Sequence, residues 1–163
     1  METDVGYDAE VWRQMSQELG LTGIHVPESY GGQGFGISEL AIATEEMGRS
    51  LLCSPYFAST VMGATAIMKA GSEEQKQTLL PGIAAGEVVT TLAFTEENGR
   101  WDDQAVTMTA TQTDGTYVLN GSKSFVLDGH TADLVIVVAR RPDSKGADGL
   151  SFFTVAGQAT GRP

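Results

Sequence analysis

The sequence predicts an α+β fold in which an N-terminal all-α helical domain, residues 1–86, precedes an antiparallel, β-barrel-like domain, residues 87–163. Three observations support this prediction. Apolar residues recur at helical spacing in the first domain, and in the second they alternate with polar residues. The dipeptides Asp114-Gly115 and Asn120-Gly121 in the second domain are typical of tight hairpin turns.

The helices of the first domain can be placed from spacing and capping residues. Residues 8–19 predict an amphipathic helix that stops at a glycine. Residues 38–48 predict a second helix with Ser38 as its N-cap. Residues 56–71 carry one charge and many small side chains, which indicates a buried helix that packs closely against its neighbours. Residues 72–81 begin with the S-x-x-Q pattern of a capping box.

The strands follow from alternation and turns. Residues 106–111 alternate apolar side chains with threonine, which is typical of a half-buried strand. A short strand over residues 117–119 lies between the hairpin turns, and residues 123–127 are expected to pair with it. Residues 134–139 and 150–155 predict two more strands. The final residues add no closing strand, so we expect the β-domain to be incomplete and the chain to be a fragment of a longer protein.

Composition excludes several classes of protein. Hydrophobic residues make up 41% of the chain and charged residues 19%, an ordinary globular balance. The net charge of −11 and the lack of Lys/Arg runs disfavour nucleic acid as a partner. Cys53 is the only cysteine, and His25 and His130 lack ligand spacing, so no metal site is expected. No apolar run reaches the roughly 20 residues of a membrane span and no signal peptide is evident, so a cytoplasmic location is the default expectation.

The stretch YGGQGFG, residues 30–36, raises the question of a phosphate-binding loop. A dinucleotide fingerprint needs a preceding strand, a following helix and then a second parallel strand. Here the following helix leads into another helix, and the lysine of a Walker loop is absent. A connection that lets two helices pack is therefore favoured over a cofactor cradle.

Several segments follow one another in an order typical of one family. ELGLTGIHVPESYGGQGFG and then EEMGRS occupy the first half, and GSEEQKQTLLPGIAAGE leads into the sheet. LAFTEE and YVLNGSKSFVLDGHTADLVIVVAR follow in the second half. In this order and spacing the chain resembles the acyl-CoA dehydrogenase family, from its N-terminal helical domain into most of its middle β-domain.

The resemblance implies a FAD-dependent flavoprotein that removes two hydrogens across the α and β carbons of an acyl-CoA thioester. A carboxylate base takes the α-proton, and the β-hydrogen leaves as hydride to the flavin. In the family this base usually lies in a C-terminal helical domain, so it is expected beyond Pro163, and this chain alone is expected to be inactive. The implied partners are an acyl-CoA substrate, electron-transfer flavoprotein as acceptor, and other acyl-CoA dehydrogenase subunits in a homo- or hetero-oligomer.

The resemblance also implies cofactor contacts on a first flavin-binding strand. Phe94, Thr95 and Glu96 fall on it, and there backbone groups and a threonine hydroxyl bond the polar edge of the isoalloxazine ring. From the residues alone, the preference of threonine for strands explains Thr95 better than a ligand contact does.

Phe125, Val126 and Leu127 fall on the second flavin-binding strand, where an aromatic residue stacks on the flavin and a hydroxyl reaches the N5 region. Phe125 can supply the stacking surface, although by alternation alone it could equally be a core residue. Leu127 has no hydroxyl, so hydride acceptance would lose a hydrogen bond at N5 or depend on backbone groups for it.

The loop after Glu96 departs further from the family pattern. Arg100 stands where glycine is expected and Trp101 where a small hydroxyl residue is expected, beside the flavin pyrophosphate and the CoA phosphates. The indole narrows that loop, whereas Arg100 offers a charged contact to phosphate. By pattern alone, the two residues are a solvated loop charge and a packing anchor.

Three functions therefore remain open from the sequence. One is an acyl-CoA dehydrogenase, the second is a flavin-poor structural subunit that completes a partner's site, and the third is a flavin oxidase or monooxygenase of the same fold. Heteromeric members of the family pair a subunit that keeps its flavin site with one whose site has degenerated. The departures at Trp101 and Leu127 resemble those of such members and indicate a specialised or catalytically impaired one.

Overall fold

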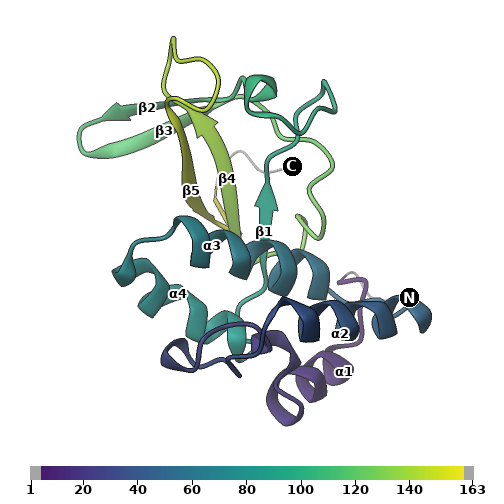
Figure 1. The fold of residues 1–163 in the computed structure, drawn as a ribbon. Helices are drawn as coiled ribbons and strands as arrows, with labels where there is room; N and C mark the ends of the chain where they lie inside the picture. The colour runs from purple at the N-terminus through teal and green to yellow at the C-terminus, as the bar shows by residue number, and fades with distance from the viewer. Residues whose placement is uncertain (1–4, 160–163) are drawn as a thin grey trace.

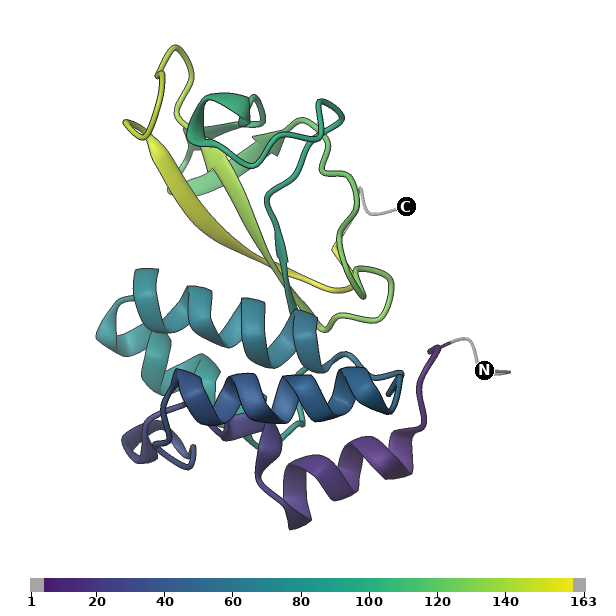
Figure 2. The ribbon, with the colours of Figure 1, turned by 45° about the vertical axis from the view of Figure 1, so that its right-hand side comes forward.

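The chain forms a layer of helices on which a mixed β-sheet stands (Figures 1 and 2). The computed structural model describes residues 5–159. The α-helices are α1 (Ala9–Arg13), α2 (Ile37–Arg49), α3 (Thr65–Ala70) and α4 (Glu73–Ala84). The strands are β1 (Thr90–Ala93), β2 (Thr109–Thr113), β3 (Thr116–Asn120), β4 (Leu134–Arg140) and β5 (Leu150–Ala156). A helical domain followed by a β-domain is thus confirmed.

The first predicted helix forms as two consecutive segments. Helix α1 starts at Asp8, whose carboxylate accepts the backbone N–H of Glu10 at 2.8 Å. It continues into a wider, π-helical turn, η1 (Gln14–Glu18), and ends before Gly20, whose φ of 64° turns the chain away. The apolar residues that predicted this helix, Trp12 and Met15, are buried.

Helix α2 begins two residues earlier than predicted, with its N-cap at position 36 in place of 38. Gly36 is its N-cap, and the carboxylate of Glu39 accepts the Gly36 N–H at 2.9 Å. Helix α4 opens on the predicted capping box, in which Ser72 and Gln75 exchange two hydrogen bonds. The helix runs through Pro81 to Ala84, beyond the predicted end.

The segment of small residues packs against the sheet. It forms the π-helical segment η4 (Phe57–Ala64) and then α3, with η4 lying against β1. At Gly63 a Cβ atom would come within 2.2 Å of the Thr90 Cγ2, so only glycine allows this approach. The predicted close packing is confirmed, and its partner is a strand.

The sheet has the strand order β1-β4-β2-β3, with β5 also paired to β4. Strands β2 and β3 form the predicted hairpin, in which Asp114 and Gly115 both have positive φ. Strands β4 and β5 are antiparallel along their whole length. Within residues 5–159 the sheet does not close into a barrel.

The expectation of a purely antiparallel sheet is corrected by two parallel pairings. Strand β1 pairs parallel with β4 from Thr90↔Leu134 to Ala93↔Val137, and β2 joins β4 parallel at Thr109↔Arg140. Strand β4 is a continuous apolar run that is buried almost throughout. Such a run is typical of a central strand with parallel partners and does not show the alternation of a meander.

Residues 123–127 do not form the predicted partner strand of β3. They lie beside the continuation of β1, where the Ser124 N–H donates to the Thr95 carbonyl at 2.9 Å. The segment from Gly121 to Asp133 instead crosses from the hairpin to the start of β4, which allows β4 to run parallel to β1.

Three apolar clusters hold the layers together. The first joins the helices to the sheet and contains Val26, Ala64, Ile67, Leu80, Ile83, Ala84 and Ile136. The second lies within the helical layer and contains Trp12, Met15, Ile24, Leu40, Tyr56 and Val89. The third, which we call the β-domain cluster, contains Ala93, Ala132, Val135 and Val137, with Met108, Leu119, Val126 and Val155 packed against it. Among residues 5–159, no helix has the length and apolar character that crossing a membrane requires.

Candidate functional site

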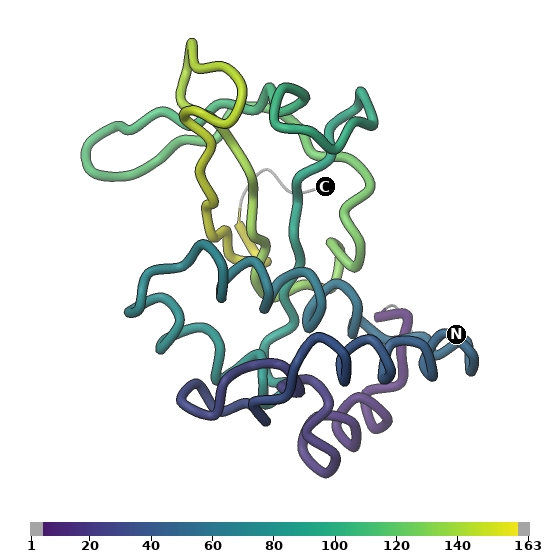
Figure 3. Tube along the Cα trace, in the orientation of Figure 1, coloured from purple at the N-terminus to yellow at the C-terminus, as the bar shows by residue number. Residues whose placement is uncertain are grey.

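The glycine-rich stretch has no backbone donor left for a phosphate. The N–H groups of Gln33, Gly34 and Phe35 donate to carbonyls of residues 23–26 at 2.9 Å each. The neighbouring glycine N–H groups are also bonded internally, and at Gly32 a Cβ would come within 2.0 Å of the Val26 carbonyl oxygen. Figure 3 shows this dark blue stretch in the helical layer, apart from the strands. The prediction of a structural connection is confirmed.

The predicted cofactor residues lie on two segments that run side by side. Residues 94–96 follow β1, and residues 123–127 descend next to them (Figure 1). Besides the Ser124–Thr95 hydrogen bond, the buried Thr91 hydroxyl donates to the Leu127 carbonyl at 2.7 Å. The two segments that the resemblance singled out are thus brought together.

Glu96 is the most constrained residue of the first segment. It is only 5% exposed, and its carboxylate accepts hydrogen bonds from the backbone N–H groups of Thr107 and Met108 and from the Thr107 hydroxyl. It also forms an ion pair of 2.8 Å with Lys123, and both side chains are 6% exposed. Burial alone would raise the pKa of Glu96, but these donors, Lys123 first, lower the pKa to about 2. The carboxylate therefore faces inward, and the Glu96 carbonyl already accepts the Gly99 N–H at 2.9 Å, so the backbone N–H of Glu96 is the group that remains for a ligand.

Thr95 lies between these interactions with its side chain uncommitted. The residue is 7% exposed. Its carbonyl accepts the Ser124 N–H, whereas its hydroxyl has no hydrogen-bond partner within residues 5–159. A nearly buried hydroxyl without a protein partner is suited to a polar ligand atom.

Phe125 presents an aromatic ring to the outside. It is 82% exposed, and its backbone has a φ of 56°, a left-handed conformation that residues other than glycine rarely adopt. Its neighbour Val126 packs inward against the β-domain cluster, and Leu127 is half exposed. The left-handed backbone at Phe125 thus directs its ring outward, while the residues on either side are held by packing and hydrogen bonds.

The loop after Glu96 holds Arg100 and Trp101 at the surface. The Arg100 guanidinium binds the Asp102 carboxylate at 2.8 and 3.0 Å, so its charge is already balanced. Trp101 is 79% exposed, and its ring meets Phe94 edge to face with centroids 5.7 Å apart. The loop is therefore an ordered turn that displays an indole.

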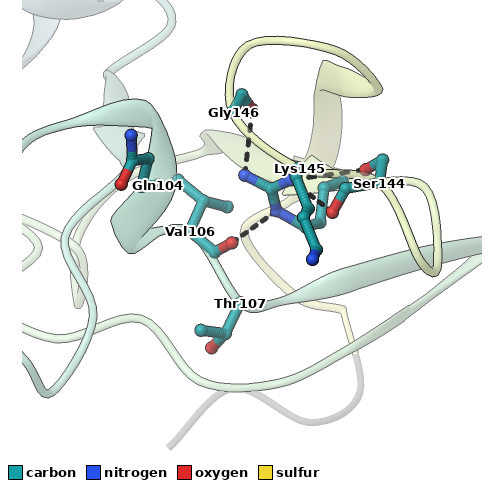
Figure 4. A pocket seen from close by; sticks show the side chains of 7 residues that line it. Gln104, Val106, Thr107, Ser144, Lys145 and Gly146 are labelled. Carbon is teal, nitrogen blue, oxygen red and sulfur yellow. Dashed lines mark hydrogen bonds between the residues drawn. The ribbon is translucent and has the colours of Figure 1, made fainter.

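A cavity of about 530 Å³ adjoins this region and is lined by Gln104, Val106, Thr107, Arg140, Ser144, Lys145 and Gly146 (Figure 4). Arg140 is 7% exposed and donates to the carbonyls of Asp103, Val106, Ser144 and Gly146. Val106 and Gly146, labelled in Figure 4, lie on two different loops, and both of their carbonyls accept hydrogen bonds from Arg140. No carboxylate among residues 5–159 pairs with it, so together with Lys145 it gives the cavity a positive wall.

Sequence reasoning missed Lys123 and Arg140. Lys123 lies 27 positions from Glu96, and no short-range pattern links them. Arg140 ends an apolar strand, where a charge usually marks the return to solvent. Its burial next to four carbonyls becomes visible only in three dimensions.

His25 lies in the helical layer, outside this region. His25 is buried, its Nε2 lies 3.0 Å from the Thr65 hydroxyl, and burial lowers its pKa. Its Nδ1 has no partner among residues 5–159, and no group of side chains that could hold a metal occurs in that range.

Two family models match the chain in succession. The N-terminal domain of acyl-CoA dehydrogenase matches residues 1–87, and its middle domain matches residues 91–162. The chain is 38% identical to acryloyl-CoA reductase (NADH) of Anaerotignum propionicum over 152 residues, which cover 91% of this chain and 38% of that protein. It is 35% identical to mitochondrial isovaleryl-CoA dehydrogenase of Solanum tuberosum over 156 residues, 94% of this chain and 38% of that one.

Solved structures share the fold. The Tcur3481-Tcur3483 steroid ACAD superposes with a TM-score of 0.80 at 33% identity, covering 96% of this chain and 41% of that one. A protein described as a FAD-dependent dehydrogenase superposes with a TM-score of 0.82 at 30% identity, covering 95% and 43%.

Proposed function

Because the chain belongs to the acyl-CoA dehydrogenase family, we propose that it is part of a FAD-dependent enzyme that introduces a double bond between the α and β carbons of an acyl-CoA thioester. The chain spans 38% of the length of the two curated relatives, so the proposal concerns the protein of which these residues are part. The observation that carries it is the pairing of residues 94–96 with residues 123–127, which sets the uncommitted Thr95 hydroxyl beside a segment that exposes Phe125. The substrate is proposed to be a lipid or sterol side-chain thioester.

The residues present fit a flavin ring in two respects. The Thr95 hydroxyl is available to bond the polar edge of a heterocycle, and the open ring of Phe125 can cover an aromatic face. Both lie on segments fixed by hydrogen bonds, so little conformational entropy remains to be lost on binding. Leu127 fits less well, since it supplies only apolar contact where a hydroxyl would strengthen binding.

The chain's own residues would act by positioning and by excluding water. Bound FAD would supply the acceptor for the hydride that leaves the β-carbon. Thr95 would hold the polar edge by a hydrogen bond, and Phe125 and Leu127 would provide an apolar boundary that keeps water away. Val126, a predicted cofactor residue, packs inward and would support this segment from behind. The general base is proposed to come from another segment or another subunit, because the carboxylate of Glu96, next to the candidate cofactor residues, is buried and paired with Lys123.

The cavity beside Thr107 supports a substrate that carries phosphate. The five N–H groups of the buried Arg140 guanidinium donate to four carbonyls and the Ser144 hydroxyl, so Arg140 would act on an anion through its charge, and Lys145 adds a second cation. An anionic group would find favourable electrostatics there, which fits the phosphates of coenzyme A. Trp101 and Arg100 remain proposed substrate contacts on the neighbouring loop, although Asp102 competes for the Arg100 guanidinium.

A second candidate function is a structural subunit of a heteromeric enzyme. The name of the steroid ACAD joins two components, Tcur3481 and Tcur3483. Two features of this chain favour such a role: the exposed indole of Trp101, and the presence of Leu127 where a side chain with a hydroxyl is expected. In either case we propose other acyl-CoA dehydrogenase subunits as partners and electron-transfer flavoprotein as acceptor; a flavin oxidase or monooxygenase is the remaining alternative.

Flavin content and reduction test these proposals. The protein, co-expressed with any partner subunit, is expected to purify yellow with the visible absorbance of FAD. Anaerobic addition of an acyl-CoA should bleach that absorbance, and slow reoxidation by air would separate a dehydrogenase from an oxidase. A colourless preparation that takes up no added FAD would contradict the catalytic proposal and support the structural one.

A further inference from the structure

The buried ion pair between Glu96 and Lys123 is placed where three segments meet. Glu96 ends the segment after β1, Thr107 and Met108 lead into β2, and Lys123 precedes Phe125 by two positions. The lysine amine is 2.8 Å from Glu96 and 3.4 Å from the Phe94 carbonyl. A single carboxylate thus connects the start of β2 to both candidate cofactor segments.

The pair is enclosed and internally satisfied. Both side chains are 6% exposed, and the glutamate oxygens receive donors from Lys123, Thr107 and Met108. A buried ion pair is weak as a stabilising device, because desolvation offsets much of its attraction. The best-supported role of a buried ion pair is to select one conformation of the chain over others. The Glu96–Lys123 pair is therefore expected to fix the conformation of the segments that it joins.

What it holds in place is the backbone around Phe125. That ring is exposed, so its own packing cannot keep the residue in the left-handed conformation. The conformation must be imposed by the flanks. On the C-terminal side the Leu127 carbonyl is fixed by Thr91, and on the N-terminal side the anchors are the Ser124–Thr95 bond and the Lys123–Glu96 pair.

We propose that Glu96 and Lys123 are positioning residues, whose ion pair fixes residues 123–127 and so presents Phe125 and Thr95 to the cofactor without either charge touching it. This inference rests on the proposed function, since it deepens the account of the same flavin surface. It also assigns Glu96 a different task from the direct cofactor contact that the family resemblance implies.

The test uses the variant Lys123→Met, which keeps the length of the side chain and removes its charge. Two quantities are measured: the hydrogen-exchange rate of the Ser124 amide in the protein without added flavin, and the Kd for FAD from flavin fluorescence. At least a tenfold faster exchange of Ser124 and at least a tenfold weaker Kd are expected.

Two control variants separate positioning from charge and from general stability. Lys69→Met removes an exposed cation on α3, and it should change neither quantity. Val155→Ala trims a side chain packed on the β-domain cluster, and should lower the melting temperature without selective exposure of Ser124. For each variant, the exchange rate of the Ser124 amide is measured at a temperature that lies the same number of degrees below the melting temperature of that variant.

The outcomes are distinguishable. If Ser124 exchanges no faster in Lys123→Met than in Val155→Ala, the positioning role is wrong. A wild-type protein that binds no FAD overturns the proposed function instead, and this is read from a separate measurement. If Lys123→Met does not fold, Glu96→Gln removes the ion pair from its other side and keeps a side-chain oxygen that can accept a backbone N–H of Thr107 or Met108. About threefold faster Ser124 exchange in Glu96→Gln supports the role, and an unchanged rate overturns it.

Discussion

Phe125 combines two properties that single residues rarely share: an exposed aromatic ring and a left-handed backbone. The φ of 56° costs a non-glycine residue about 1–2 kcal/mol relative to its usual conformations. The ring recovers little of this by packing, because it is 82% exposed. The cost is therefore better explained by a contact made with something outside the chain.

The change Phe125→Gly separates the two properties. Glycine removes the ring and tolerates positive φ, so the free energy of unfolding should stay the same or rise by up to about 1 kcal/mol. The Kd for FAD should rise roughly tenfold, because a stacking contact is worth about 0.5–1.5 kcal/mol beyond its area. Thermal unfolding and flavin titration measure the two effects. A Kd equal to that of the wild type would remove Phe125 from the site.

Leu127 allows a matched pair of substitutions. Leu127→Thr introduces the hydroxyl that the family pattern expects, whereas Leu127→Val gives nearly the same shape without it. Threonine should strengthen FAD binding about five- to tenfold relative to valine, since a net hydrogen bond contributes about 1 kcal/mol. Equal Kd values for the two variants in flavin titration would show that the missing hydroxyl is unimportant. Trp101→Ser tests the second departure in the same assay, with tighter binding expected.

His25 makes the fold sensitive to acid. Burial lowers its pKa, so the folded state keeps the ring neutral while the unfolded state takes up a proton below about pH 6.5. The stabilisation is therefore complete above pH 6.5 and is lost as the pH falls below that value. The free energy of unfolding should fall by up to about 1.4 kcal/mol per pH unit between pH 6.5 and the lower pKa of the folded state.

Urea unfolding at a series of pH values measures this slope. His25→Gln should flatten it. If the slope persists in His25→Gln, another group is responsible.

At the scale of elements, the approach of η4 to β1 depends on one missing side chain. Gly63→Ala would place a Cβ within 2.2 Å of the Thr90 Cγ2 and should destabilise the fold by about 1–3 kcal/mol through overpacking. Gly48→Ala, near the end of α2, meets nothing within 4 Å and should stabilise by up to about 1 kcal/mol. Melting temperatures of the two variants should therefore move in opposite directions. Adding Thr90→Ser to Gly63→Ala removes Cγ2 and should restore part of the loss; a melting temperature of Gly63→Ala at or above wild type would contradict this packing.

Local patterns predicted the helices better than the sheet. The capping box at Ser72 and the apolar spacing of Trp12 and Met15 are local signals, and each gave a helix at the right place. Ser38 is not the cap because Glu39 reaches back to the Gly36 N–H, which starts the helix two residues earlier. Boundaries depend on such single contacts, whereas the existence of a helix depends on the whole periodic run.

Strand partners could not be obtained from alternation. The Asp114-Gly115 turn fixed β2 and β3 as neighbours, because a two-residue loop determines its own register. Residues 123–127 have a strand-like composition, yet the Lys123–Glu96 pair and the Thr91 hydroxyl draw them to β1. The candidate site was found through a resemblance to known sequences, and its inner contacts are long-range interactions that no local pattern records.

For the whole molecule, the helices and the sheet share one cluster. Ile136 of β4 packs among Ile67, Leu80 and Ile83 of the helical layer. The Trp12 indole also donates to the Gly86 carbonyl at 2.9 Å, where the chain passes from helices to sheet. Neither layer can lose its order without exposing apolar surface of the other.

Thermal unfolding is therefore expected as a single transition. In Trp101→Phe, fluorescence reports only Trp12 in the helical layer, while the amide I infrared band of β-structure reports the sheet. The two midpoints should agree within error. Separate midpoints would show that the layers unfold independently, despite their shared cluster.

The hydrogen bonds of Arg140 couple the motions of two loops. The Arg140 guanidinium donates hydrogen bonds to carbonyls in residues 103–106 and in residues 144–146. Neither loop can therefore open without breaking its hydrogen bonds to the arginine that also holds the other loop. The two loops therefore form one cooperative unit of local opening, although they are far apart in the sequence. A ligand that binds in the cavity would reduce the mobility of both loops together. Conversely, opening of either loop would disorder the side of the cavity that the ligand contacts.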